Sequence, residues 1–217
     1  MVYGVGSVVN NAARNAQIAR GGRVVMFDLG YFGPKKTGGY FKMSLDFDHP
    51  WRHFDITPND PRRWRLLGIP IRKDAGDGPI VLVGLGPKAR QYLNLHDWET
   101  RKLSELKERF PGKEILFRSK PGKHAIEIKC KVNSDGPIDA VLKGTSLVVC
   151  RHSNVAVDAV IAGVPFECED GAAKWLVGKP YTTENRLDFL RRCAYWQWRA
   201  SESREAWKFI TGIIDAT

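Results

Sequence analysis

The chain lacks the signatures of several enzyme classes and of secreted or membrane proteins. None of its four cysteines forms a CxxC pair, and no HExxH, GxxxxGK[ST] or GxSxG motif is present. These absences argue against a disulfide or zinc framework, a metalloprotease, a P-loop kinase and a serine hydrolase. No apolar run approaches membrane-spanning length and no signal peptide is visible, so we expect a cytoplasmic protein with reduced thiols.

The composition allows a sizeable core and favours an acidic partner. The 217 residues are 43% apolar, enough for one large domain or two small ones. The formal charge of +10 favours nucleic acid or a phosphate-bearing ligand. Because this charge is spread along the chain, a solvated basic surface without a specific partner remains the alternative.

Residues 145–168 predict a strand, a turn, a helix and a second strand. Leu147–Cys150 is a short β-branched run, as in strands covered on both faces. A small apolar helix follows and ends at Gly163, where a helix terminus favours positive φ. A strand–turn–helix unit presents backbone N–H groups and a positive dipole end at the carboxyl edge of a parallel sheet, where phosphates bind.

The turn of this unit carries three polar side chains, His152, Ser153 and Asn154. Ser153 or Asn154 is a good N-cap for the helix. Together with the backbone N–H groups, the three residues predict a phosphate site. In the alternative, Ser153 only caps the helix and His152 is an ordinary loop histidine.

The region before this unit predicts the rest of a second α/β half. Residues 79–84 form its first strand, 85–87 an exit turn, 97–110 a helix and 114–118 the next strand. Residues 125–132 alternate, as in an edge strand or hairpin arm, and 137–143 form a short helix. Arg118 and Lys120 lie where the second strand ends, which adds cationic side chains suited to a nucleotide diphosphate.

The first half predicts a strand, a helix and a strand over residues 2–28. Its Gly4-x-Gly6 is a truncated dinucleotide fingerprint that a tight turn explains equally well. Residues 40–48 alternate between apolar and polar side chains, which predicts a half-buried strand. The strand leads to His49 and Trp51, and two carboxylates, this histidine and this indole near one sheet edge can form an acceptor site with a general base. An exposed strand face with ordinary charges is the alternative.

Two further regions have simpler interpretations. Residues 55–78 are rich in Pro, Arg, Asp and Gly, and connect the two halves. Within them residues 62–65 either contact nucleic-acid phosphates, with Trp64 available for stacking, or form a solvated linker face. Residues 187–199 and 201–213 predict two amphipathic helices whose tryptophans, 196, 198 and 207, belong to the core.

The order of several segments resembles a known family. These segments are residues 3–7, 28–31, 42–46 with 49–51, 118–121, 152–165 and 195–198. Together they resemble phage-encoded glycosyltransferase-like proteins of the GT-B type that are associated with DNA modification. In related bacterial transferases a His-Pro pair follows the strand that here ends at Arg118. This chain carries Lys120-Pro121 there, and a lysine can still neutralise phosphate.

The resemblance implies an α/β fold of two Rossmann-like halves (GT-B-like) with C-terminal helices. Residues 1–60 are then a small acceptor-side half and 61–78 a linker. Residues 79–184 are the nucleotide-binding half. Residues 185–217 are C-terminal helices that can pack back on the first half.

The resemblance also implies sugar transfer from a nucleotide sugar, without a covalent protein intermediate. Asp28 is the first candidate for the acceptor-side base and His49 the second. The expected nucleotide- or phosphate-binding residues are Gly84, Arg118, Lys120, His152, Ser153 and Asn154. The expected acceptor-binding residues are Tyr31, Lys42, Ser44, Asp46 and Trp51. We expect no metal, and the nucleotide sugar serves as substrate rather than cofactor.

The phage association and the basic charge make DNA the expected acceptor. The first candidate is a hydroxymethylated pyrimidine, met in a host cytoplasm and flipped out of the duplex or used as a nucleotide. One alternative is a non-catalytic nucleic-acid-binding protein that retains the fold. Another is a transferase for cell-surface carbohydrate, for which a basic membrane-surface helix is expected and none is evident.

Overall fold

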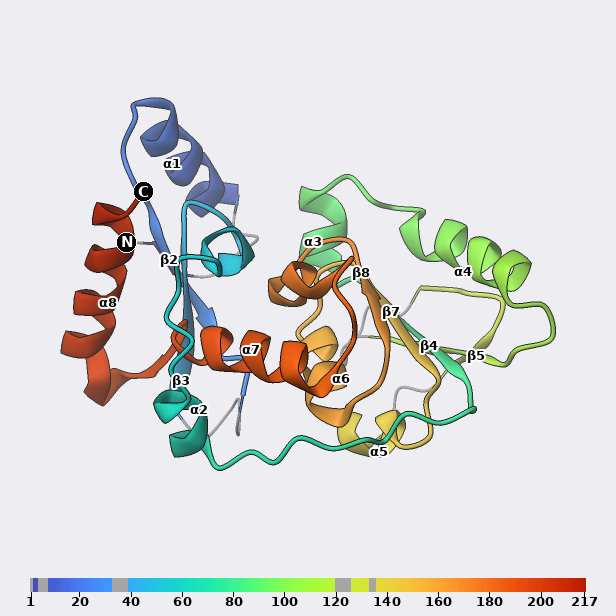
Figure 1. Cartoon of the computed structure of the whole chain (residues 1–217). Coiled ribbons are helices and arrows are strands. Elements are labelled where there is room, and N and C mark those ends of the chain that lie inside the picture. Colours follow the sequence, from blue (N-terminus) through green and yellow to red (C-terminus); the bar gives the residue numbers. More distant parts are fainter. Residues whose placement is uncertain (1, 4–7, 33–38, 120–125, 133–135) are drawn as a thin grey trace. The chain divides into compact units, whose positions relative to one another are not determined.

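The computed structural model describes residues 2–3, 8–32, 39–119, 126–132 and 136–217. The chain divides into two compact units (Figure 1). Unit 1 consists of Met1–Pro70 and Gly171–Thr217, and unit 2 consists of Ile71–Asp170. Unit 1 is therefore assembled from both ends of the chain, and unit 2 from the segment between them.

Unit 2 contains a sheet of five parallel strands. These strands are β4 (Ile80–Val83), β5 (Ile115–Arg118), β6 (Lys131–Val132), β7 (Leu147–Cys150) and β8 (Phe166–Cys168). Their spatial order is β6-β5-β4-β7-β8. The first strand along the chain, β4, therefore lies in the middle of the sheet. The next two, β5 and β6, extend it to one edge, and β7 and β8 form the other side. This is the strand order of doubly wound nucleotide-binding sheets, whose topological switch point lies here between β4 and β7.

Helices cover both faces of this sheet. On one face α4 (Trp98–Arg109) packs Leu103 and Leu106 against Ile80, Leu82 and Phe117. The strand residues between those that contact α4 point to the opposite face of the sheet, because side chains alternate along a strand. On that side α6 (Val155–Ala162) contacts β7 and β8, and α5 (Ile138–Leu142) contacts α6 (Figure 1). Burial on both faces explains why β4 and β7 read as continuous apolar runs.

Most predicted elements of unit 2 are confirmed. The strands near 79–84 and 114–118, the helices near 97–110 and 137–143, and the strand–turn–helix–strand unit of 145–168 are all present. Gly163 has φ +84° at the end of α6, as predicted. The predicted turn at 85–87 leads into a helix that was not predicted, α3 (Pro87–Tyr92). Of the two alternatives for residues 125–132, the structure shows the edge strand, because β6 pairs in parallel with β5 at the edge of the sheet, but β6 comprises only Lys131–Val132.

Unit 1 contains a mixed sheet of four strands. These are β1 (Val2–Tyr3), β2 (Val25–Leu29), β3 (Tyr40–Leu45) and β9 (Gln197–Arg199), in the order β1-β2-β3-β9. The strands β1 and β2 run parallel and are connected by α1 (Val8–Ala19), whereas β3 is antiparallel to both β2 and β9. A mixed α/β fold with one parallel sheet is therefore present, but an architecture of two Rossmann-like halves is not confirmed.

Short helices and two longer ones complete unit 1. They are η1 (Pro50–His53), α2 (Arg62–Leu67), η2 (Ala172–Leu176), α7 (Thr183–Ala194), η3 (Ala200–Glu202) and α8 (Ser203–Asp215). An aromatic core joins the two sequence segments of the unit: Phe54 stacks edge-on against Phe189 and Trp175. The N-cap of α7 is Thr182, whose hydroxyl accepts the Asn185 N–H.

The predicted helix over residues 187–199 was wrong at its end. The chain leaves α7 at Ala194 and forms β9, because β3 still has an unpaired edge and the Trp196 carbonyl accepts the Met43 N–H at 2.8 Å. The core assignment of the tryptophans is confirmed for Trp196 and Trp198, which are buried, whereas Trp207 is 41% exposed.

The prediction that β3 is half-buried was also wrong. Lys42 and Ser44, expected on a polar face, are only 4% and 2% exposed. Their face of the sheet is covered: Arg14 of α1 contacts Met26 on the neighbouring strand, and the His49 ring reaches Lys42. Alternation in the sequence therefore separated the two faces correctly but could not show that both are covered.

The predicted stacking role of Trp64 was wrong as well. Residues 62–67 form α2, and Trp64 is buried edge-on against Phe32 at a centroid distance of 5.3 Å. Arg63 is also used within unit 1, since its guanidinium lies 3.5 Å from the Trp198 ring centre and donates to the Ala194 and Gln197 carbonyls. Neither side chain is available to a nucleic acid.

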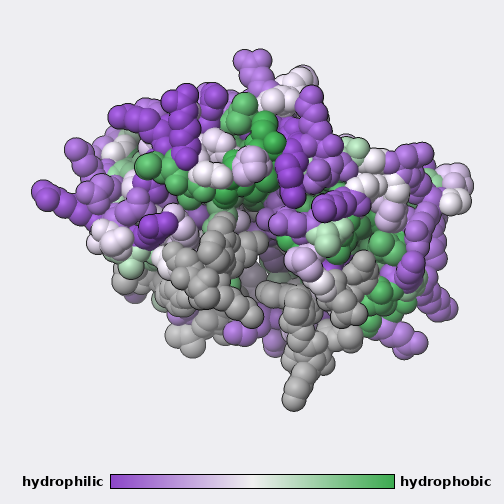
Figure 2. Space-filling view, turned by 90° about the horizontal axis from the view of Figure 1, so that it is seen from below, coloured by the Kyte–Doolittle hydropathy of each residue, from purple (hydrophilic) through white to green (hydrophobic). Residues whose placement is uncertain are grey.

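Figure 2 shows one face on which most projecting side chains are hydrophilic and hydrophobic residues show between them. No helix in the described part of the chain is long and apolar enough to cross a membrane.

Candidate functional site

The segments that follow β4 and β7, which we call the exits of these strands, lie on either side of the topological switch point of unit 2. The chain leaves β4 at Gly84 and β7 at Arg151, and both lie at the carboxyl edge because the strands are parallel. Ligands of doubly wound sheets bind outside this edge, where neighbouring connections run to opposite faces. The predicted residues Gly84, His152, Ser153 and Asn154 all belong to these two exits.

The exit of β7 offers hydrogen-bond donors. The Ser153 hydroxyl accepts the Val155 N–H at 3.1 Å, while the Asn154 side chain makes no capping hydrogen bond at the start of α6. Residues 151–155 are all partly exposed. No hydrogen bond within the described residues uses the backbone N–H of Ser153 or Asn154. These two N–H groups can therefore serve an anion at the positive end of α6.

Gly84 and Arg118 are tied to each other at the neighbouring strand ends. The Gly84 N–H donates to the Arg118 carbonyl at 2.9 Å, and a Cβ at position 84 would lie 2.6 Å from the Phe117 ring. Glycine at this position is therefore required for packing. Arg118 is 9% exposed and its guanidinium donates to the Gly136 carbonyl at 2.7 Å. Lys120 lies outside the described residues.

A buried ion pair, which the sequence analysis missed, fixes the exit of β4. Glu99 on the first turn of α4 is fully buried, and its Oε1 accepts the Leu85 N–H at 2.9 Å and Arg90 Nη2 at 2.6 Å. A carboxylate in a low-dielectric core needs such partners. The only available signal was a glutamate in the first turn of a helix, which usually indicates an exposed residue.

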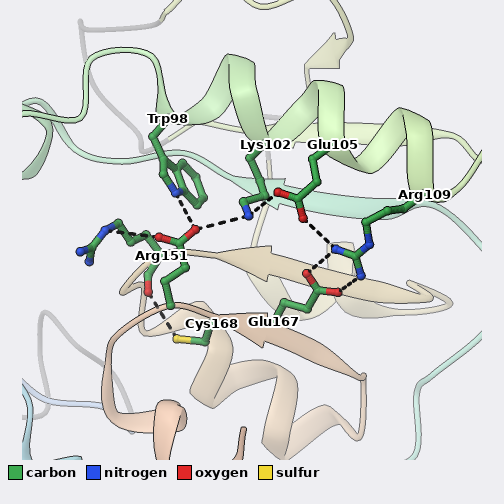
Figure 3. A network of polar contacts seen from close by, with 8 residues as sticks. Trp98, Lys102, Glu105, Arg109, Arg151, Glu167 and Cys168 are labelled. Atoms are coloured by element: carbon green, nitrogen blue, oxygen red, sulfur yellow. Dashed lines mark hydrogen bonds and ion pairs between the residues drawn. The ribbon is translucent and has the colours of Figure 1, made fainter. Parts of the chain in front are cut away.

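A polar network on the α4 face reaches the exit of β7 (Figure 3). The Trp98 indole N–H donates to Glu169 at 2.9 Å, and Lys102 Nζ lies 3.4 Å from the same carboxylate. Glu169 in turn lies 3.6 Å from Arg151 Nε. The sequence analysis did not select Arg151, although it directly precedes the predicted turn.

At the far end of this network Arg109 makes several hydrogen bonds to carboxylates. Arg109 donates to both oxygens of Glu167, at 3.0 and 2.5 Å, and to Glu105 at 3.0 Å (Figure 3). These hydrogen bonds, above all that to Glu167, raise the pKa of Arg109. The hydrogen bond from Lys102 likewise lowers the pKa of Glu105, against the opposing effect of its slight burial.

In unit 1, four predicted residues converge near one end of β2 and β3. Lys42 Nζ lies 3.8 Å from Asp28 Oδ2, 3.4 Å from His49 Nδ1 and 5.3 Å from the centre of the Tyr31 ring. Asp28 and Lys42 are register partners on the two strands. The Asp28 side chain is 34% exposed, whereas His49 is 5% exposed and Tyr31 is fully buried. Asp28 is therefore the member of this cluster that solvent reaches best.

The other three predicted acceptor residues have different surroundings. Ser44 is buried on the same face of β3, two residues beyond Lys42. Asp46 accepts the Val24 N–H at 2.8 Å, pairs with Arg23 at 2.8 Å and has φ +61°, so it stabilises the turn after β3. The Trp51 ring lies beneath Arg52, at 4.7 Å from its guanidinium carbon.

Gln197 is a second residue that the sequence analysis missed. It is 1% exposed, and its carboxamide accepts the Phe32 N–H at 2.7 Å and donates to the Phe32 carbonyl at 3.1 Å. This clamp fixes the segment that carries Tyr31. It also explains Gly30, where a Cβ would lie 2.8 Å from the Gln197 side-chain oxygen. A single glutamine among aromatic residues gives no such signal in the sequence.

Three of the cysteines are buried in the described part of the chain. Cys150, Cys168 and Cys193 are buried free thiols, and burial raises the pKa of Cys193 well above its ordinary value. Among the described residues, no group of three or more His, Cys, Asp or Glu side chains is placed to hold a metal ion.

Comparison with known proteins identifies the type of fold. No family model and no curated protein sequence matches the chain. Among solved structures, the chain is similar to the beta Kdo 2,4 transferase of Thermosulfurimonas dismutans KpsC, with a TM-score of 0.55 and 13% identity over 90% of this chain and 79% of that one. The beta Kdo 2,7 transferase of the same KpsC matches with a TM-score of 0.49 and 15% identity over 87% and 77%.

The first of these matches shows a glycosyltransferase-like fold, which confirms the predicted resemblance at that level. Because it covers 90% of the chain, it includes parts of both units. A phage origin, a role in DNA modification and the roles of the individual site residues stay predictions.

Proposed function

We propose that this protein is a glycosyltransferase that binds a nucleotide-sugar donor at the switch point of unit 2. The observation that carries the proposal is the position of the Ser153 and Asn154 N–H groups, which have no acceptor among the described residues. They lie at the start of α6, on the carboxyl side of β7 in a sheet of strand order β6-β5-β4-β7-β8. Such N–H groups stabilise a leaving phosphate as its charge develops. The likeness of the fold to a Kdo transferase supports sugar transfer.

For the acceptor side we propose that Asp28 is the general base. A base must reach the proton of the acceptor hydroxyl, and the Asp28 carboxylate is far more exposed than His49. Lys42, at 3.8 Å from Asp28, places a positive charge beside the carboxylate and beside an incoming acceptor. Tyr31 and His49 hold this lysine in place through ring contacts and proximity.

As acceptor we propose DNA that carries hydroxymethylated pyrimidines. The support is the net charge of +10, which attracts an acidic polymer. The buried position of Trp64 removes one candidate stacking surface, so contacts with DNA are expected to be mainly electrostatic. An acidic carbohydrate is the competing acceptor, since the structural neighbour is named for transfer of Kdo.

The donor site is tested by removing a single backbone N–H. Asn154 has φ −60°, which proline adopts, so Asn154→Pro removes the N–H without forcing this angle. Asn154→Ala removes the side chain but keeps the N–H and is the matched control. We expect Asn154→Pro to weaken nucleotide binding about tenfold, and Asn154→Ala to bind like the wild type.

Binding is measured by thermal shift and calorimetry against nucleotides and nucleotide sugars, including activated Kdo, because a ligand raises apparent stability. Transfer is then measured from each binding donor to hydroxymethylated DNA, unmodified DNA and acidic carbohydrate. Asp28→Asn should abolish transfer and leave donor binding intact. Salt-dependent DNA binding without affinity for any nucleotide sugar would instead identify a non-catalytic DNA-binding protein.

A further inference from the structure

The guanidinium of Arg151 makes no hydrogen bond among the described residues. Its two closest partners are carboxylates beyond hydrogen-bond distance, with Glu169 at 3.6 Å from Nε and Asp170 at 3.8 Å from Nη1. Its Nη1 is buried and without a hydrogen-bond partner. A guanidinium has five N–H donors, and a buried donor left without an acceptor is costly. Arg151 is thus held in place electrostatically while its donors remain unused.

One of the two carboxylates beside Arg151, that of Glu169, has other partners on its second oxygen. Glu169 accepts the Trp98 indole N–H at 2.9 Å and lies 3.4 Å from Lys102 (Figure 3). The backbone of Arg151 is fixed as well, since its carbonyl accepts the Asp170 N–H at 2.6 Å. The arginine is therefore positioned by its surroundings without having its hydrogen-bonding capacity consumed.

A comparison within the same network shows how unusual this is. Arg109, at the other end, is more exposed than Arg151, with 41% of its side chain accessible against 22%. Nevertheless Arg109 makes three hydrogen bonds to carboxylate oxygens. The two arginines thus differ in whether their donors are used, and the less exposed one has them unused.

We propose that Arg151 binds a phosphate group of the ligand of unit 2. Arg151 is the first residue after β7, in the same turn as the Ser153 and Asn154 N–H groups. A guanidinium can grip a phosphate through two parallel N–H···O hydrogen bonds, which a single amide cannot do. The inference rests on the proposed donor site and assigns the side chain that carries its positive charge. The ligand class is a phosphate or diphosphate ester.

The experiment uses inorganic pyrophosphate, titrated calorimetrically into the full chain at low ionic strength. Arg151→Gln is expected to weaken pyrophosphate binding by about tenfold or more, because it removes charge-assisted hydrogen bonds. The matched control is Arg109→Gln, which removes the same charge from the same network and is expected to bind like the wild type. If Arg151→Gln does not fold, Arg151→Lys replaces it. Lysine keeps the positive charge but cannot form two parallel hydrogen bonds to a phosphate. Pyrophosphate is therefore expected to bind this variant several-fold more weakly than the wild type.

Two results would overturn the inference. One is a wild type that binds no pyrophosphate. The other is an equal loss in Arg109→Gln and Arg151→Gln, which would mean that pyrophosphate responds only to net charge. Pyrophosphate carries neither a base nor a sugar, so its binding is independent of transferase activity. A protein that binds it through Arg151 yet transfers no sugar would refute the proposed function and leave this site standing.

Discussion

Replacing Glu99 by leucine should destabilise unit 2 by about 3–5 kcal/mol, the usual cost of removing one partner from a buried ion pair. The structure sets this magnitude. Glu99 is fully buried, the Arg90 side chain is 13% exposed, and the Leu85 N–H would lose its acceptor in the same substitution. In a chain of 217 residues, such a loss lowers Tm by roughly 10 °C.

The matched double variant separates charge compensation from packing. Arg90→Met with Glu99→Leu removes both charges, so it should be more stable than Glu99→Leu alone although it carries one more substitution. The control Glu114→Leu breaks an exposed pair with Lys131 and should cost less than about 1 kcal/mol. Urea unfolding followed by circular dichroism measures all four proteins. A double variant no more stable than Glu99→Leu alone would refute the reasoning.

Three further predictions concern the other buried features. Gln197→Leu leaves the Phe32 N–H and carbonyl without partners and should cost about 1–3 kcal/mol for each group, measured by urea unfolding. Burial and, less strongly, the Arg23 charge lower the pKa of His53 below 6.5. The unfolded chain therefore binds this proton more readily, so Tm should fall as the pH drops below about 6.5, and His53→Phe should reduce that slope. Gly84→Ala should cost about 1–3 kcal/mol, because the Phe117 ring must move.

Two of these substitutions have a control in the same chain. Gln17→Leu makes the same change as Gln197→Leu on the exposed surface of α1 and should leave stability nearly unchanged. Gly212→Ala places a Cβ where no atom lies within 4 Å and should be neutral or slightly stabilising. A His53→Phe protein with the same pH slope as the wild type would show that other groups govern acid stability.

Local signals were sufficient for the unit that surrounds the proposed donor site. The strand β7, the turn, α6 and Gly163 follow one another along the chain. The residue types in each of them favour the structure that it adopts. Residues 195–199 had no comparable local signal. Their aromatic residues fit a helix equally well, and the open edge of β3, far away in sequence, makes residues 197–199 a strand.

The site residues divide in the same way. His152, Ser153 and Asn154 were predicted because strand–turn–helix units have a known chemistry. Glu99, Arg151 and Gln197 were missed, since their importance comes from burial and from partners that lie far apart in the sequence. Lys42 was predicted, but on an exposed face instead of a covered one. A sequence pattern thus shows which atoms a turn can offer, but not which side chains are already paired.

The interrupted course of unit 1 has a consequence for how the protein acquires its structure. The strand β9 completes the sheet beside β3, yet the ribosome synthesises it only after all of unit 2. The central segment is complete earlier and has shorter loops to close, so we expect it to fold first during translation. Until residues 197–199 emerge, the edge of β3 in the amino-terminal segment has no strand beside it. We therefore expect the nascent chain to be most prone to aggregation at this stage of synthesis.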